Sequence, residues 1–395
     1  MQRKQIDWIT GYLQLCDMTE PPELYHEWIA ISVLASAMKR KCWLPWGHIT
    51  WFPNMYIVLV GPSGRCRKGT AMNIGASIMR EMGLRIAAES VTRESLIQEL
   101  LECTDTAVLE SGTIKTHASM NIYAQELVVF LGQNNTRLLM DLVDWYDCRD
   151  RWKYKTKTQG TDEIVNVWVN LIGATTPHLI QTNLPADTVG GGLASRIIFV
   201  YQEDKKQSVP EPFLTPQLID LREELINDLE QVNILGGAWD MHKDVLNFYR
   251  PWYINNDKDP PFADNAMFDG YITRRPGHLL KLSMIMSASR GNDKKIILVD
   301  IERAAELLER TEKFMPFTFA GVGRSRDSDL LADLMAFIFT RRKVTKSALL
   351  NAFKTDIESN KQLDDLIVRM RIMRFIKVVV NLKGDTFITC LVTEL

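Results

Sequence analysis

The sequence lacks paired cysteines and lacks any long apolar run. Its six cysteines lie far apart, with no CxxC pair and no nearby histidine at metal-ligand spacing, so we expect reduced thiols rather than disulfides or a zinc site. The longest strongly apolar stretch near the start, Ile29 to Met38, is about half the length of a bilayer-spanning helix. No stretch at the amino terminus resembles an export signal, and we expect a cytoplasmic protein without a membrane anchor.

An excess of one charge is also absent. The 47 Lys and Arg residues against 49 Asp and Glu residues give a net charge of -2, so any contact with nucleic acid depends on local basic clusters. No internal repeat or low-complexity segment is visible, which argues against a solenoid or a disordered chain. What is present is a chain of 395 residues, 46% of them hydrophobic, which is enough for a large core and two or three domains.

Alternating helical and strand patterns predict an α/β fold. Residues 1–50 carry apolar residues at helical spacing and predict an N-terminal helical segment, in the role of a collar or lid. Five candidate strands with covering helices over residues 51–210 predict the core. Residues 211–322 are mainly helical and predict a lid, whereas residues 323–395 predict three helices and a hairpin, as in a winged-helix domain.

A glycine-containing turn joins a predicted strand, Phe52 to Val60, to a predicted helix, Lys68 to Met82. Such a turn offers backbone N–H groups, a lysine and a hydroxyl, which a triphosphate with its Mg²⁺ requires. In the predicted nucleotide site, Lys68 contacts the phosphates and Thr70 is the candidate magnesium ligand. The full set predicted to bind ATP is Gly61, Pro62, Ser63, Gly64, Arg67, Lys68, Gly69 and Thr70.

The spacing in this turn departs from the strict GxxxxGK[ST] pattern. Lys68 stands one residue late and Gly69 separates it from Thr70, which leaves open which hydroxyl meets the metal. The alternative is a tight glycine turn before a solvated basic helix start. The apolar strand that precedes the turn favours nucleotide binding.

A carboxylate follows a second candidate strand. Glu126 ends the stretch Ile122 to Glu126, where an ATPase places the base that polarises the attacking water, and it is also a candidate to hold Mg²⁺ through water. Gln125 stands where an aspartate is usual, which weakens metal binding. The alternative is an ordinary surface glutamate at a helix start.

Polar residues near later strands and the lid are candidates for phosphate contacts. Thr175 and Thr176 follow a strand and could orient water against the γ-phosphate, or could equally cap the next helix. Thr176 is the chosen candidate for the water.

Arg196 precedes the last strand and is a candidate arginine finger for a neighbouring subunit; the alternative is a surface arginine at a strand edge. Arg274 and Arg275 precede a lid helix and could sense phosphate, with Arg275 the chosen residue, or could be solvated surface charges.

Basic and aromatic residues alternate from Arg149 to Lys157. In an extended strand this alternation puts the basic side chains on one face, with Trp152 and Tyr154 on the other. The predicted DNA-binding residues of this hairpin are Arg151, Lys153, Lys155 and Lys157. The alternative is a solvated edge strand protected by its lysines.

With these residues in place, the chain resembles a family of phage- and mobile-element P-loop ATPases that are similar to MCM and superfamily-three replicative helicases. The resembling blocks are Leu24 to Trp28, Phe52 to Thr70, Ile172 to Pro177 and Gly192 to Arg196, within roughly half of the chain. The resemblance implies an AAA+-like core and a hexameric, ATP-driven DNA helicase or translocase, with single-stranded DNA in the pore, the basic hairpin facing it and a winged helix at the carboxyl end. It also implies replication proteins as partners and a bacterial host cytoplasm.

Two other functions remain open at this point. In the first, ATP acts as a switch for a replication initiator or helicase loader that does not unwind DNA. In the second, the chain is a DNA-binding scaffold that does not hydrolyse ATP, which the irregular loop and Gln125 favour.

Overall fold

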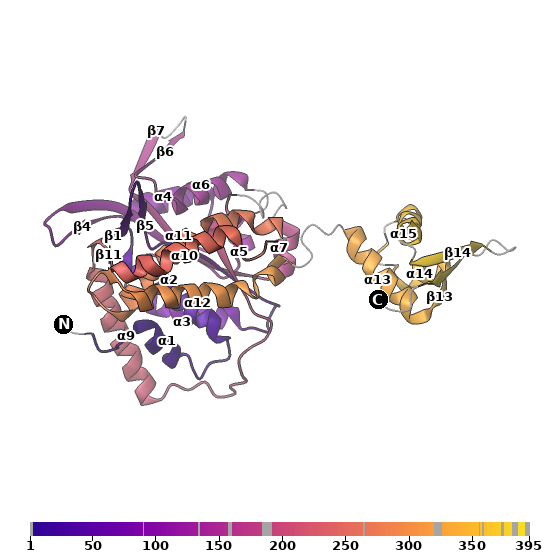
Figure 1. Ribbon diagram of the computed structural model, residues 1–395, viewed down its shortest axis with the longest axis horizontal. Helices are drawn as coiled ribbons and strands as arrows, with labels where there is room; N and C mark the ends of the chain where they lie inside the picture. The colour runs from indigo at the N-terminus through magenta and orange to yellow at the C-terminus, as the bar shows by residue number, and fades with distance from the viewer. Residues whose placement is uncertain are drawn as a thin grey trace. The chain divides into compact units, whose positions relative to one another are not determined.

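The computed structural model describes the chain apart from residues 1–2, 90, 133–134, 157–159, 184–191, 264, 320–325, 355, 358, 373–374, 381–385 and 392–395. It forms two compact units, Met1–Ala320 and Gly321–Leu395. Both contain helices and sheets, so the mixed α/β class predicted from the sequence is confirmed (Figure 1). Among the described residues, no helix combines the length and the apolarity that crossing a bilayer requires.

Five strands form the central sheet of the first unit, in the order β4-β5-β8-β3-β9. Their bounds are β3 Tyr56–Val60, β4 Thr104–Val108, β5 Ile114–Ala124, β8 Val167–Thr175 and β9 Ile197–Tyr201. β4 runs antiparallel to β5, and the other neighbours pair in parallel. β3 and β8 are buried along their whole length, as expected for parallel strands covered on both faces. β8 therefore separates β3 from β5.

Helices cover both faces of this sheet. The Tyr56 hydroxyl donates to the Leu142 carbonyl of α6 at 2.8 Å, whereas the Asn170 amide donates to the Ser32 carbonyl of α2 at 3.2 Å. Tyr56 pairs with Leu171, the neighbour of Asn170, so these side chains point to opposite faces. Among its described residues, the α-helices of this unit are α1 Trp8–Leu15, α2 Glu23–Met38, α3 Lys68–Glu81, α4 Arg93–Glu102, α5 Leu127–Leu131, α6 Thr136–Tyr146, α7 Pro177–Asn183, α9 Pro216–Ile234, α10 Lys243–Lys258, α11 Asp269–Arg290 and α12 Leu298–Glu312.

The N-terminal helices are part of the core rather than a collar or lid. Every residue of α2 from Trp28 to Met38 is buried, and the helix contacts α1, α3, α9 and α11 as well as the sheet. A helix that is apolar on all sides packs inside a domain instead of forming a separate cover. The expected segments 1–50 and 51–210 therefore pack, with the helices that follow, into one compact unit.

Short elements differ from the sequence expectation. The stretch predicted as a strand near Leu84 to Ala88 makes only one parallel bridge, from Ile86 to Asn121. The helix expected over residues 127–145 is two helices, α5 and α6. The basic hairpin expected from the sequence is formed by β6 Arg151–Thr156 and β7 Gly160–Val165. Elements that were not predicted are β1 Cys42–Trp46, β2 Ile49–Trp51, η1 Ala194–Arg196, β10 Gly237–Ala238, β11 Asp240–Met241, η2 Ala266–Phe268, β12 Lys295–Ile296 and η3 Met315–Phe319.

The second unit has three helices and a three-stranded sheet around its own core. In chain order its elements are α13 Arg326–Arg341, β13 Lys343–Thr345, α14 Lys346–Ala352, α15 Asn360–Ile372, β14 Ile376–Val380 and β15 Thr386–Cys390. The sheet order is β13-β15-β14, and all pairs are antiparallel. Buried side chains from each helix and from the sheet, including Leu334, Ile338, Leu349, Leu363, Met370 and Ile388, form a separate hydrophobic cluster.

Candidate functional site

The carboxyl ends of β3, β5 and β8 meet at one edge of the sheet. Val60 and Thr175 are paired strand ends, and the Gly61 N–H donates to the Thr175 carbonyl at 3.4 Å. Glu126 follows the end of β5 and is exposed. In open parallel sheets this edge is where ligands bind. The structure thus brings the predicted loop, the predicted carboxylate and the threonine pair to the same edge.

Two glycines shape the loop after β3. A Cβ on Gly61 would lie 2.4 Å from the Gln202 carbonyl oxygen, so no other residue fits without displacing backbone. Gly64 has φ +73°, a conformation that favours glycine. Residues 63–65 form a turn ahead of α3, and Ser63 and Gly64 are exposed. The loop therefore offers N–H groups of the kind that bind anions ahead of a helix.

Arg67 stands where the strict phosphate-loop pattern has glycine. It lies in the left-handed region, with φ 52° and ψ 37°, directly before α3. This conformation costs a non-glycine residue about 1–2 kcal/mol. The Arg67 guanidinium is paired with Glu20, Nε to Oε2 at 2.7 Å. The loop therefore makes its left-handed turn without the usual glycine.

Lys68 is the first residue of α3 and folds back over the loop. Its Nζ donates to the carbonyls of Gly61 at 2.6 Å and Pro62 at 3.1 Å. Burial lowers the pKa of Lys68, and the charges of Cys66 and Glu126 partly oppose this shift. The ammonium thus lies within the loop and feels the carboxylate at the end of β5.

Oxygen atoms from the end of β5 face the start of α3. The Gln125 amide nitrogen donates to Asn73 Oδ1 at 2.6 Å, and its Oε1 lies 3.6 Å from where a Cβ on Gly69 would be. The Glu126 side chain makes no capping hydrogen bond to α5. Carboxylate and amide oxygens suit magnesium, which keeps several waters when it is bound with phosphates. Gln125 and Glu126 therefore offer oxygen atoms of the kind that hold magnesium.

Thr70 is the third residue of α3 and is exposed. Among the described residues, no cluster of three histidine, cysteine or acidic side chains forms a ready metal site. The magnesium role of Thr70 stays a prediction.

The two threonines after β8 have different environments. The Thr176 hydroxyl accepts a hydrogen bond from the Leu179 N–H at 3.3 Å and so caps α7. Thr175 is only 2% exposed, and in the described part of the chain its hydroxyl has no hydrogen-bond partner. Buried polar groups without partners are uncommon and call for an explanation. Thr175, rather than the predicted Thr176, carries the uncommitted hydroxyl beside Gly61.

Arg196 lies at the opposite edge of the sheet from Lys68. It precedes Ile197, which pairs with Tyr56, the first residue of β3. Gly61 lies five residues after Tyr56 in the direction of β3, which corresponds to roughly 17 Å at about 3.3 Å per residue. Arg196 and Lys68 of one chain therefore cannot contact the same phosphate.

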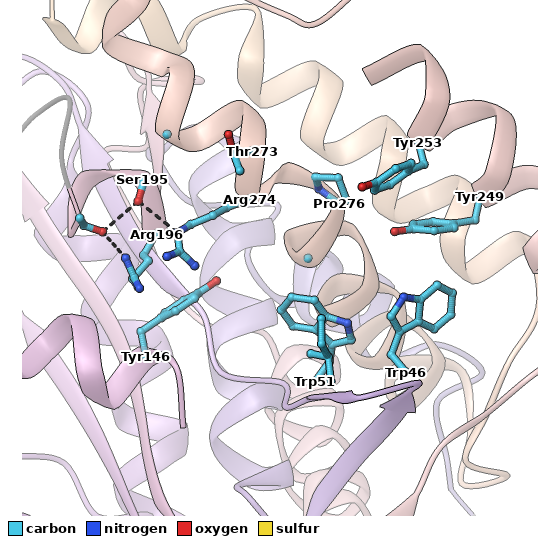
Figure 2. Close-up of a pocket in the computed structure, with 14 residues that line it drawn as sticks. Trp46, Trp51, Tyr146, Ser195, Arg196, Tyr249, Tyr253, Thr273, Arg274 and Pro276 are labelled. Atoms are coloured by element: carbon cyan, nitrogen blue, oxygen red, sulfur yellow. Dashed lines mark hydrogen bonds between the residues drawn. The ribbon is translucent and has the colours of Figure 1, made fainter. Parts of the chain in front are cut away.

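The Arg196 side chain is held by a carboxylate rather than extended into solvent. Its Nε donates to Asp147 Oδ1 at 3.1 Å, its Nη2 donates to Oδ2, and its Nη1 donates to the Gly192 carbonyl at 2.6 Å. Arg274 Nε donates to Ser195 Oγ at 3.2 Å (Figure 2). Arg274 Nη1 lies 3.6 Å from Asp147 Oδ1. The Arg196 side chain is 6% exposed and that of Arg274 is 35% exposed. Sequence reasoning chose Arg196, but Arg274 is the more accessible arginine of this pair.

Arg275, the predicted phosphate sensor, is engaged in a buried ion pair. Its Nε and Nη2 donate to the two carboxylate oxygens of Glu312 at 2.6 and 2.8 Å, and its guanidinium lies 4.5 Å from the Trp252 ring centroid. The two side chains are 7% and 5% exposed. A phosphate would have to displace Glu312, so the geometry assigns Arg275 to lid packing.

Glu312→Gln is expected to lower the free energy of unfolding by about 3–5 kcal/mol, because it leaves the Arg275 charge buried without a counter-charge. Denaturant unfolding measures this change. The matched control is Glu306→Gln, an exposed position on the same helix, where we expect a change within about 0.5 kcal/mol. Loss of nucleotide affinity with unchanged stability would instead assign Arg275 to the ligand.

The β6–β7 hairpin separates aromatic from basic side chains as the alternation predicts. Trp152 is buried, and Tyr154 stacks on it with ring centroids 6.2 Å apart. Arg151, Lys153 and Lys155 are exposed. Figure 1 shows the hairpin extending away from the rest of the first unit. Its described basic side chains are therefore accessible to a charged partner.

Part of the hairpin's positive charge is paired across its two strands. Arg151 and Lys153 lie 3.3 and 3.6 Å from the carboxylate oxygens of Glu163. Lys157, the fourth predicted DNA contact, lies outside the described residues. The positive face is therefore weaker than the sequence of β6 alone implies.

No protein-family model matches this chain, and no curated protein matches it either.

Proposed function

We propose that the chain is a P-loop nucleoside triphosphatase with an AAA+-like core, which assembles as a ring and drives DNA in phage or mobile-element replication as a helicase or translocase. The observation that supports this most is the meeting of Lys68, Glu126 and Thr175 at the ends of three neighbouring strands. The order of those strands places the carboxylate one strand away from the loop, with the threonine between them. We expect a hexamer.

In the proposed reaction, the loop amides and Lys68 hold the β- and γ-phosphates of ATP. Magnesium, with Gln125 and Glu126 beside it, would offset the phosphate charge. Glu126 accepts a proton from the water that attacks the γ-phosphorus, the bond to the bridging oxygen breaks, and ADP leaves. We propose that Thr175, rather than Thr176, orients that water, and the support is that its hydroxyl has no hydrogen-bond partner in the described part of the chain.

The opposite edge of the sheet supports the proposal of assembly. Arg196 lies too far from its own Lys68 to serve the phosphate held there, and Arg274 lies beside Arg196, so neither serves the ATP of its own loop. An ATP held by the loop of a neighbouring subunit is the one that they could contact. Arginines supplied in trans stabilise the transition state of phosphoryl transfer. A repeated head-to-tail contact gives a ring when its rotation closes and an open filament when it does not, and we propose the ring. We propose Arg274 as the group that contacts the neighbouring subunit's nucleotide, with Ser195 and Asp147 holding its guanidinium in place.

The hairpin supports the proposal of single-stranded DNA as the partner. Removing three charges with Arg151→Ala, Lys153→Ala and Lys155→Ala is expected to weaken DNA binding at least tenfold, because each basic group neutralises one phosphate. The slope of log affinity against log salt is expected to fall by about 2. Fluorescence anisotropy with a labelled oligonucleotide measures both.

The control for the hairpin variant removes the same charge elsewhere. Lys243, Arg250 and Lys258 are exposed on α10, and their triple alanine variant should bind DNA as the wild type does. If both triple variants weaken DNA binding equally, overall charge is responsible and the hairpin has no specific role.

The order of elements in the second unit supports a winged-helix assignment: a helix, a short strand, two helices and an antiparallel pair of strands. In such domains the start of the last helix enters the major groove. Here the exposed Asp364 and Asp365 lie in the first half of α15, whereas Arg369 and Arg371 lie near its end. Two carboxylates repel DNA phosphates, so we propose that this unit contacts replication proteins.

An alternative is a chain that uses ATP as a switch, as an initiator or loader, or that binds DNA without hydrolysis. The observation that favours it is Gln125, which replaces an acid and is hydrogen-bonded to Asn73. A strand-displacement assay separates unwinding from loading. Measured ATP hydrolysis separates both from a scaffold.

A further inference from the structure

A cavity of about 680 Å³ lies at the edge of the sheet that is remote from Lys68. Its walls come from the β1–β2 hairpin, the η1 turn, α10 and α11. Figure 2 shows that its two ends differ: Arg196, Arg274 and Ser195 gather at one, and Trp46, Tyr249 and Tyr253 at the other. A ligand that fits both ends has an anionic part and a flat apolar part.

The arginine end carries more positive than negative charge. Arg196 and Arg274 are there, and among the described residues Asp147 is the carboxylate that contacts them. Burial lowers the pKa of Arg274, and the charge of Arg196 lowers it further, so the two guanidinium groups repel each other. A phosphate accepts charge-assisted hydrogen bonds from arginine and would relieve this repulsion.

Three aromatic side chains line the other end of the cavity, and one of them is exposed. Trp46 meets Tyr249 edge-on at 5.2 Å, and Tyr249 lies 5.7 Å from Tyr253, one helical turn further along α10. Tyr253 is 43% exposed, so its ring is available to a ligand. Trp51 packs against Gly277 of α11 and closes the floor. Stacking on aromatic side chains contributes about 1–3 kcal/mol per nucleobase.

We propose that this cavity binds a nucleoside phosphate, with the phosphate at Arg274 and the base at Tyr253. The chain's own loop cannot supply this ligand, because Gly61 is roughly 17 Å away along the sheet. The nucleotide comes from solution or from the loop of a neighbouring copy, and only the second source depends on the function proposed above.

The test uses Lys68→Ala protein, which lacks the main phosphate contact of the loop. Titration with a fluorescent ATP analogue is expected to show saturable binding that persists on dilution. Arg274→Gln and Tyr253→Ala, each added to Lys68→Ala, should weaken that binding about tenfold, because each removes one end of the site. Adenosine and inorganic triphosphate, which each satisfy one end, should bind at least tenfold more weakly than ATP.

Matched controls lie on α10. Arg250→Gln removes an equivalent charge and Ile254→Ala an exposed apolar side chain, both away from the cavity, and neither should change the affinity. If a neighbouring copy is the source, Lys68→Ala protein will not bind. Arg274→Gln and Tyr253→Ala will then weaken binding only in chains with Lys68 intact, and only at concentrations where subunits assemble.

Two results distinguish a failure of the cavity proposal from a failure of the proposed function. Binding that depends on Tyr253 and Arg274 but is unchanged by Lys68→Ala supports the cavity and contradicts the P-loop. If folded Arg274→Gln and Tyr253→Ala proteins bind nucleotide as the parent does in both backgrounds, the cavity proposal is wrong, whatever the loop does.

Discussion

Lys68→Ala is expected to lower ATP turnover at least 100-fold, because the ammonium that neutralises the phosphates in the transition state is lost. Lys68 donates only to loop carbonyls in this structure, so its removal should leave the fold intact. Glu126→Gln should lower turnover by a similar factor while ATP affinity is retained, since general bases contribute about 100- to 10,000-fold. Steady-state phosphate release and equilibrium ATP binding measure the two effects.

Arg80→Ala is the matched control for Lys68→Ala. Arg80 is an exposed basic residue near the other end of α3, and turnover should stay at the wild-type value. Turnover that survives Lys68→Ala unchanged, in the same preparation, would contradict both readings in which the chain hydrolyses ATP at this loop.

Mixing two inactive variants is expected to restore activity. Arg274→Ala should lower turnover at least 100-fold, as expected for an arginine that acts on a neighbour's phosphate. In an equal mixture with Lys68→Ala, an intact Lys68 meets an intact Arg274 at some interfaces. Random neighbours should give about a quarter of wild-type turnover. The measurement is phosphate release against mixing ratio.

The control for this mixing experiment is the double variant with both substitutions. The double variant supplies neither an intact Lys68 nor an intact Arg274, so mixing it with either single variant should restore no ATP turnover. A mixture of the single variants that assembles, yet hydrolyses ATP no faster than its parents, would show that Arg274 acts within its own subunit or not at all.

The strand, loop and helix around Lys68 were predictable because their signals are local. An all-apolar strand, a glycine turn and a helix with alanine at its start occur within about 25 residues. Glu126 was predictable for a similar reason, since it follows an apolar run. These signals do not depend on distant packing.

The choices between neighbouring residues could not be made from the sequence. Thr175 and Thr176 are the same residue type, and only the hydrogen bond to Leu179 shows which is a cap. Arg274 and Arg275 are likewise adjacent, and the partner that decides between them, Glu312, lies 37 residues further along the chain.

Short or polar elements escaped prediction because they lack a clear period. β4, Thr104–Val108, is largely exposed, and β1 and β2 have only five and three residues. The cavity was also missed, because its aromatic wall joins Trp46 to Tyr249 and Tyr253, about 200 residues later in the chain. Tertiary packing alone creates that proximity.

The most direct test is photo-crosslinking with an ATP analogue that is reactive at its γ-phosphate, followed by peptide mapping of wild-type protein with magnesium. We predict label on the peptide that contains residues 61–70, lost when unlabelled ATP is added in excess. Saturating label that never falls on this peptide, or a folded protein that binds no magnesium nucleotide with or without DNA, would contradict the phosphate-binding loop.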